Sequence, residues 1–248
     1  MMPSERPPYP LYPVTIKSSH LVTPHMQRLT IAGTCLSGLR PDLPAQWFKV
    51  FVTQPDGRLS GGRAYTVRSV DWATGDVTLD LFLHGDSGPV SAWAHGAQAG
   101  DRLQISAVHP RSGYAIAAET QHYLLFGDET ALPAIGAILQ ALPAHATAQV
   151  FAEVANPAEQ QQLLSPASLR VTWFYRDTAA PASAAPLEAA ARTAAIPATG
   201  MAIWAAGESA QISAIRKLLL KERGVDKHNL HAVGYWKNGE ADHRDETL

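Results

Sequence analysis

The chain has 248 residues, of which 46% are hydrophobic and 17% charged, and its net charge is -2. This length favours two domains of similar size, and the small net charge provides no basic field for nucleic acid or an anionic membrane. The single cysteine, Cys35, excludes an internal disulfide and a thiolate-held metal site. No run reaches the about 18 to 20 apolar residues of a membrane helix, and the proline-rich residues 1–12 lack an apolar segment. We therefore expect a cytoplasmic monomer without a bound metal.

The first third of the chain shows the pattern of strands separated by turns. Apolar residues alternate with polar ones or form β-branched runs, and Pro-Asp-Gly at residues 55–57 suits a tight turn. Strands at this spacing predict an antiparallel barrel or sandwich. The expected strands are several short ones within 14–31, then 47–53, 63–70, 77–83 and 99–105.

One of these strands contains Arg63-Ala64-Tyr65-Thr66-Val67-Arg68. On a strand, Arg63 and Tyr65 share one face and Thr66 and Arg68 the other. An arginine can grip a pyrophosphate, a tyrosine ring can lie against an aromatic system, and a threonine can hydrogen-bond a heteroatom. Flavin adenine dinucleotide (FAD) needs all three, whereas an amphipathic edge strand with solvated arginines is the alternative.

A second informative segment is the loop at residues 84–94, His-Gly-Asp-Ser-Gly-Pro-Val-Ser-Ala-Trp-Ala. Its two glycines allow the backbone close to a ligand, and Pro89 fits a first helical turn over 91–94. Exposed N–H groups at such a helix start can bind phosphate. The alternative is a plain connection between a strand and a helix.

The composition changes near residue 117, where alanine-rich helical stretches begin to alternate with apolar strands. This alternation predicts a parallel sheet whose ligand lies at the carboxyl ends of the strands. Helices are expected after residue 130 and over 208–223, and a loose crossover with a short helix over 178–199. The expected strands are 122–127, 149–154, 170–175, 201–206 and 230–234.

Five motifs occur in order along the chain: R-x-Y-T-x-R at 63–68, H-G-x-x-G-P-x-S-x-W at 84–93, G-D-E-T-A-L-P-A-I at 127–135, W-x-A-G-E-S at 204–209 and G-Y-W-x-x-G at 234–239. Together they resemble the siderophore-interacting protein family of flavin-dependent ferric-siderophore reductases, within the ferredoxin-reductase-like superfamily. The resemblance covers nearly the whole chain. It implies an antiparallel FAD-binding β-barrel over 1–117, followed by an NAD(P)H-binding α/β domain with a mostly parallel sheet over 118–248.

The resemblance also implies residue roles at the flavin. Arg63 would contact the pyrophosphate, Tyr65 would flank the isoalloxazine, and Thr66 would approach its edge. Residues 88–91 would hold the pyrophosphate, and His84 would lie near the adenine or the base of the loop. The expected FAD-binding residues are Arg63, Ala64, Tyr65, Thr66, Arg68, His84, Gly88, Pro89, Val90, Ser91 and Trp93.

For NAD(P)H, the resemblance points to Asp128, Glu129 and Thr130 at one turn into a helix and to Gly207 and Glu208 at another. No G-x-G-x-x-G motif occurs, and carboxylates at a helix start repel a pyrophosphate. These acidic residues would therefore cap a helix or hydrogen-bond a ribose or carboxamide. For Glu208, helix capping and nicotinamide contact are equal alternatives.

One segment departs from the superfamily's motifs, and another leaves the choice between NADH and NADPH open. His109-Pro110 stands where the superfamily often has Gly-Pro, so the geometry of that turn is open. Residues 155–159 contain no arginine to receive the 2′-phosphate of NADPH, although Arg176 after the next strand can supply one. NADH and NADPH thus remain alternatives.

The implied activity is the transfer of electrons from NAD(P)H through FAD to Fe(III) in a bound siderophore or other ferric chelate, which releases Fe(II). Flavin is needed because a hydride carries two electrons and ferric iron accepts one, so no catalytic side chain is expected. An anionic ferric complex asks for an open basic site. The candidates are Lys49, Arg111, His231 and Lys237, with solvated surface charge as the alternative, favoured for Lys237. An unperturbed histidine pKa of about 6.5 at His231 would strengthen substrate binding toward pH 6.

Two other functions stay open at this stage. The chain can be a non-catalytic flavin or ferric-siderophore binding protein, or a general NAD(P)H:flavin or ferredoxin-type reductase. The absence of cysteine clusters argues against an attached iron–sulfur relay. The sequence does not specify the siderophore.

Overall fold

The computed structural model describes residue 7 and residues 9–84, 88–178 and 185–240. The chain divides into two compact units, Met1–Ala115 and Ile116–Leu248, whereas the sequence placed the division after Ala117. Within the described ranges, no helix has both the length and the apolar character needed to cross a bilayer.

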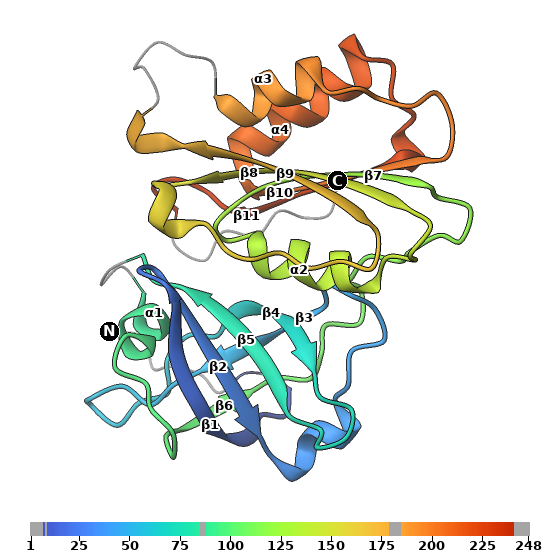
Figure 1. Cartoon of the computed structure of the whole chain (residues 1–248). Helices are drawn as coiled ribbons and strands as arrows, with labels where there is room; N and C mark the ends of the chain where they lie inside the picture. The colour runs from blue at the N-terminus through green and yellow to red at the C-terminus, as the bar shows by residue number, and fades with distance from the viewer. Residues whose placement is uncertain (1–6, 8, 85–87, 179–184, 241–248) are drawn as a thin grey trace. The chain divides into compact units, whose positions relative to one another are not determined.

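The first unit is a closed antiparallel barrel. Its strands are β1 (Tyr12–Thr23), β2 (Met26–Ala32), β3 (Trp47–Phe51), β4 (Arg63–Val70), β5 (Val77–Phe82) and β6 (Arg102–Ile105). They follow the order β1-β2-β5-β4-β3-β6 around the barrel (Figure 1). Inward-facing side chains such as Leu29 and Leu79 form one apolar core, to which the short helix α1 (Pro89–Ala94) adds Val90 and Ala94. Closure satisfies both edges of every strand, which a small sheet with one core requires.

The region predicted as several short strands within 14–31 forms the two longer strands β1 and β2. Val14 and Ile16 face the core, and the polar residues Thr15 and Lys17 beside them are exposed. A register shift between Ile16 and Ser18 bends β1 without ending it. The polar interruptions therefore belong to the outer face of a continuous strand.

The second unit is a parallel sheet with helices on both faces. Its elements are β7 (His122–Asp128), α2 (Leu132–Ala141), β8 (Thr147–Val154), β9 (Ser168–Tyr175), α3 (Pro186–Thr193), β10 (Met201–Glu208), α4 (Ser209–Lys217) and β11 (Leu230–Trp236). The five strands follow the order β11-β10-β7-β8-β9. Helix α2 covers one face, and α3 and α4 cover the other (Figure 1). The predicted combination of an antiparallel barrel with a mostly parallel α/β unit is confirmed.

Several elements of this unit differ in their bounds from the sequence expectation. The single helix predicted over 208–223 is α4, continued by a π-helical turn, Leu218–Glu222. The wider turn keeps both Leu218 and Leu219 buried in the core. Strands β8 and β9 begin earlier than predicted, at Thr147 and Ser168, because polar residues continue the pairing at their amino ends.

Candidate functional site

The barrel segment that begins with Arg63 is held in place by close packing at Gly62. A Cβ atom at position 62 would lie 2.4 Å from the ring of Phe51, so only glycine fits where β4 begins. Tyr65 is half-buried and packs against the barrel core. Burial raises the pKa of the Tyr65 hydroxyl, and Arg63 opposes this only in part. The segment thus presents a neutral aromatic ring two residues from a guanidinium.

Pairing between β3 and β4 adds two residues to this region. Thr66 lies opposite Trp47, and Ala64 lies opposite Lys49. Directly opposed residues share a face of an antiparallel pair, so Thr66, Trp47 and Lys49 lie on the same face. The Trp47 ring stacks on the His109 ring, with centroids 4.3 Å apart and planes inclined by 19°. Lys49 and Thr66, both expected site residues, are therefore brought together, along with an aromatic pair that the sequence did not predict.

The turn at residues 109–113 attaches Arg111 to this face. The His109 backbone N–H donates to the Trp47 carbonyl at 2.8 Å, and the Ser112 hydroxyl donates to the His109 carbonyl at 2.7 Å. Gly113 has a φ of +101°, and a Cβ there would lie 2.6 Å from Gln46 Cγ. A glycine after the turn, rather than one before Pro110, thus defines the geometry that the sequence left open.

The pKa of His109 is affected by burial and by the charges of Arg111 and Lys49. Burial lowers the pKa of its imidazole, and Arg111 and then Lys49 lower it further. Its Nδ1 is buried and has no hydrogen-bond partner within the part of the chain that the structure describes. Lys49 and Arg111, predicted separately, therefore both lower the pKa of the histidine that stacks on Trp47.

Arg68 has a different environment from the rest of its motif. A register shift after Val67 interrupts the alternation of β4, and Arg68 is buried with its Nε 3.8 Å from Asp80. The Asp80 carboxylate also accepts two bonds from Arg28, at 2.6 and 2.7 Å. Burial lowers the pKa of Arg68, and Asp80 opposes this. Arg68 thus helps to neutralise a buried carboxylate, and its contact with FAD stays a prediction.

The loop after β5 is partly described, because Gly85, Asp86 and Ser87 lie outside the described residues. The predicted helical turn is confirmed as α1, which begins at Pro89 directly after Gly88. Val90 is in the barrel core, so only its backbone can face a ligand. The backbone N–H of His84 donates to the Ser91 hydroxyl at 3.2 Å, which ties the two ends of the loop together. His84 itself is exposed, and Trp93 packs on the core.

In the second unit, Asp128 is the last residue of β7 and precedes α2 by several residues, so it is not at the helix start that the sequence suggested. Its buried carboxylate accepts four hydrogen bonds: from the Thr130 N–H at 2.9 Å, the Thr130 hydroxyl at 2.5 Å, the Glu208 N–H at 3.0 Å and the Trp236 indole at 2.8 Å. Burial raises the pKa of Asp128, while the Thr130 and Trp236 bonds lower it. Its Oδ1 holds the turn after β7, and its Oδ2 joins the end of β7 to the ends of β10 and β11.

Gly207 and Glu208 complete this junction. Gly207 has a φ of +148°, and a Cβ there would lie 2.7 Å from the Asp128 carboxylate. The Glu208 side chain accepts a bond from the Gln211 N–H at 2.9 Å and caps α4. In this structure the Glu208 side chain caps α4, which is one of its two predicted roles. Glycine is required at position 207 because a side chain there would collide with Asp128.

Glu129 forms a second network at the same edge of the sheet. It is buried, accepts the Ala155 N–H at 2.7 Å, and binds the Arg176 guanidinium through both carboxylate oxygens, one of them at 2.9 Å. Arg176 also lies 3.8 Å from Glu153, which accepts a bond from the Gln211 amide at 2.9 Å. Burial lowers the pKa of Arg176, but the carboxylates outweigh burial and raise it on balance. Arg176 is thus already held by carboxylates.

The two remaining substrate candidates lie on or after β11. His231 pairs with Trp204 in the register of β10 and β11, and the two rings are stacked with centroids 6.5 Å apart. Burial lowers the pKa of His231, which weighs against a charge that strengthens binding toward pH 6, and its role in substrate binding stays a prediction. Lys237 is exposed and pairs with Glu240, in keeping with the surface-charge alternative.

The fold places the chain in a class of proteins. It superimposes on a ferredoxin NADP+ reductase from Neisseria gonorrhoeae, solved with bound FAD and NADP, with a TM-score of 0.68 over 91% of this chain and 99% of that chain. At 15% identity this likeness shows the fold alone. The architecture is that of the ferredoxin-reductase-like proteins.

Matches to family models and to relatives of higher identity place the chain more narrowly than the fold does. A model described as the siderophore-interacting FAD-binding domain matches residues 15–112, and one described as siderophore-interacting protein matches residues 120–239. A siderophore utilization protein from T. fusca is 35% identical, with a TM-score of 0.81 over 95% of this chain and 96% of that chain. Ferric vibriobactin reductase ViuB from Vibrio cholerae is 29% identical over 238 residues, covering 88% of this chain and 86% of its own. The chain belongs to the siderophore-interacting protein family, which confirms the resemblance predicted from its motifs.

Proposed function

We propose that this protein is a ferric-siderophore reductase that takes electrons from a nicotinamide donor and delivers them to Fe(III) in an anionic ferric siderophore. The observation that carries the proposal is geometric: strand register places Lys49 on the barrel face that holds Thr66, and the turn that carries Arg111 is joined to Trp47 on that face by the His109 N–H and by ring stacking. Membership of the siderophore-interacting family and the likeness to ViuB support the reaction class.

The residues of the first unit fit FAD by their chemistry. Arg63 offers a guanidinium for the pyrophosphate, Tyr65 a neutral ring for the isoalloxazine, and Thr66 a hydroxyl for its edge. When bound, FAD supplies the conversion of a two-electron hydride into single electrons. The work of the protein is to bind and orient, so no side chain needs to act as an acid or base.

The ferric complex is the substrate, and it is too large and exposed to be enclosed. Attraction must therefore act over the surface, and at ordinary ionic strength it is screened within about 8 to 10 Å. Lys49 and Arg111 lie close enough to the Trp47–His109 pair to supply such a local positive field. Of the four cations expected from the sequence, these two are the pair that the substrate would meet on the barrel.

We infer further that the donor is NADH rather than NADPH. At the carboxyl ends of the sheet, the Arg176 guanidinium binds Glu129 and lies 3.8 Å from Glu153, and these two carboxylates and that of Asp128 raise its pKa. A 2′-phosphate adds about 1.5 to 2 negative charges and needs a cation, but Arg176 is bound by Glu129. A carboxylate at the end of the second strand, as Glu153 is, suits a ribose hydroxyl.

The test combines flavin binding with turnover. Purified protein should show a flavin spectrum, which anaerobic NADH bleaches and a ferric siderophore restores. Arg63→Ala should lower flavin affinity roughly tenfold or more, because a charge-assisted phosphate contact contributes about 1.5 to 3 kcal/mol. Arg58→Ala, which removes an exposed arginine, is the control and should retain flavin. Full occupancy in Arg63→Ala would mean that the flavin site is elsewhere, and bound flavin that neither donor reduces would favour the non-catalytic alternative.

The basic surface has its own test. Lys49→Ala and Arg111→Ala should each raise the KM for an anionic ferric siderophore severalfold at low salt, and added salt should erase the difference. Arg102→Ala, at an exposed position on β6, should leave the KM unchanged. A KM that is indifferent to salt and to both substitutions would refute the substrate surface while leaving the reductase activity in place.

A further inference from the structure

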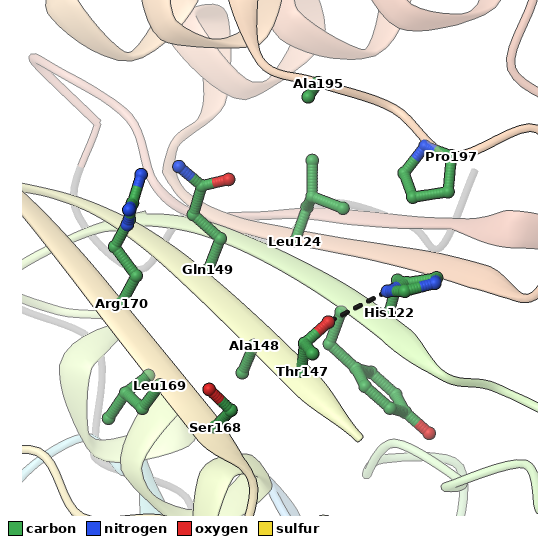
Figure 2. Close-up of a pocket in the computed structure, with 11 residues that line it drawn as sticks. His122, Leu124, Thr147, Ala148, Gln149, Ser168, Leu169, Arg170, Ala195 and Pro197 are labelled. Atoms are coloured by element: carbon green, nitrogen blue, oxygen red, sulfur yellow. Dashed lines mark hydrogen bonds between the residues drawn. The ribbon is translucent and has the colours of Figure 1, made fainter. Parts of the chain in front are cut away.

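The second unit has a cavity of about 460 Å³ at the amino ends of β7, β8 and β9 (Figure 2). It lies at the opposite ends of these strands from Asp128 and Glu153. No residue of this cavity belongs to the motifs discussed above. The cavity is therefore a feature that the proposed reductase function does not use.

The register of the sheet determines which side chains form the wall of the cavity. His122, Thr147 and Ser168 lie side by side across the three strands, and two residues further on Leu124, Gln149 and Arg170 do the same. Residues two apart on a strand point to the same face, so the two rows share one face. Ala195 and Pro197, between α3 and β10, line the other side.

Three of the polar side chains on this face have no partner among the described residues. Across the described ranges, the side chains of Arg170, Gln149 and Ser168 make no hydrogen bond or ion pair, and no aspartate or glutamate lines the cavity. By contrast, His122 Nδ1 lies 2.9 Å from the Thr147 hydroxyl. The guanidinium of Arg170 thus has no counter-charge at the cavity, unlike Arg176 at the other end of the strands.

The spacing of these groups suits one kind of ligand. Neighbouring strands lie about 4.8 Å apart, and Figure 2 shows the side chains of Arg170 and Gln149 extending next to each other from β9 and β8. A guanidinium binds a carboxylate or phosphate through two parallel bonds, and an adjacent amide adds a donor. Leu124, Ala195 and Pro197 offer an apolar wall. The volume lies within the about 300 to 1,000 Å³ that small-molecule sites occupy.

We propose that this cavity binds a small organic anion, with its carboxylate or phosphate on Arg170 and Gln149 and a short apolar body against Leu124, Ala195 and Pro197. The site is distinct from the proposed donor site, because the two lie at opposite ends of the same strands. A ligand here would therefore not compete with NADH.

The experiment uses the full-length holoprotein and three matched probes: cyclohexanecarboxylate, cyclohexyl phosphate and the neutral cyclohexanecarboxamide. Calorimetric titration should show saturable binding of at least one anion, with the amide at least tenfold weaker. Arg170→Gln should weaken the anion roughly tenfold or more, because a hydrogen-bonded charge is lost. Gln149→Leu should weaken it less, and Arg102→Gln, which removes an exposed arginine of the barrel, should leave it unchanged. The stronger anion identifies the ligand class.

Location and integrity are checked in the same samples. Backbone amide shifts on anion addition should concentrate at residues 122–124, 147–149 and 168–170, the flavin spectrum should not change, and NADH should not displace the anion. Circular dichroism should show that the variants fold, as expected for an exposed arginine. The proposal is overturned if neither anion saturates at millimolar concentration, if the amide binds equally well, or if Arg170→Gln behaves like Arg102→Gln.

Discussion

The face of the barrel around Trp47 and the carboxyl edge of the parallel sheet use charge in opposite ways. On the barrel, burial lowers the pKa of His109, and the charges of Arg111 and Lys49 lower it further. At the sheet edge, Asp128 is saturated by four donors and Arg176 is bound by Glu129. One region thus concentrates positive charge, and the other satisfies its polar groups internally.

If the proposed function holds, the two regions would serve two anionic ligands in different ways. A ferric complex that stays at the surface is attracted by a local positive field. A dinucleotide at an acidic edge must instead be held by shape and by hydrogen bonds to its neutral parts, with the networks at Asp128 and Glu129 holding the strand ends rigid. The same acidic edge would disfavour NADPH relative to NADH, because NADPH carries an additional 2′-phosphate.

The strongest test of this contrast is Asp128→Ala, which removes the acceptor that joins three strand ends. Four donors lose their partner, and at about 1 kcal/mol of net stability for each bond the free energy of unfolding should fall by about 3 to 4 kcal/mol. Urea denaturation measures this. Asp177→Ala, at an exposed position, is the control and should change stability little. A loss below about 1 kcal/mol in Asp128→Ala would mean that the junction is not structural.

The next test removes the negative charge that Glu129 presents to Arg176. Glu129→Gln keeps the acceptor for the Ala155 N–H but removes the charge that binds Arg176. The ratio of kcat/KM for NADPH to that for NADH should then rise roughly five- to tenfold, corresponding to about 1 to 1.4 kcal/mol. Steady-state kinetics with both donors measures the ratio. Adding Arg176→Ala should abolish the gain, and an equal gain in the double variant would show that Arg176 does not meet the 2′-phosphate.

The smallest expected effect concerns His109 on the barrel. Its pKa in the folded protein is lowered, so below about pH 6.5 the unfolded chain binds a proton more readily, and stability is lost as the pH falls through that value. Arg111→Ala should raise the pKa of His109 and lessen this loss, although burial, the larger cause, remains. NMR titration of the imidazole measures the pKa. An unchanged value in Arg111→Ala would separate the two cations and weaken the case for a shared substrate surface.

Local patterns in the sequence were enough to predict the fold class and the family. The alternating runs around 47–53 and 63–70 and the change to alanine-rich helices near residue 117 reflect which face of each element is buried, and that information lies in neighbouring residues. The five motifs are equally local, so their order could be read directly. The end of α4 was missed because a π-helical turn has no strong signal in the side-chain pattern.

What depended on tertiary structure was the set of partners of each charged group. Trp47 meets Thr66 through strand register, and Arg176 meets Glu129 across 47 residues of chain. His231 lies half-buried beside Trp204, and this burial lowers the pKa of its imidazole. Burial and pairing between distant strands determine whether a charge is available to a ligand, and no local periodicity records them. The sequence therefore predicted which residue types the candidate site contains. The tertiary structure determined which of their charges are already paired or buried and which can meet a ligand.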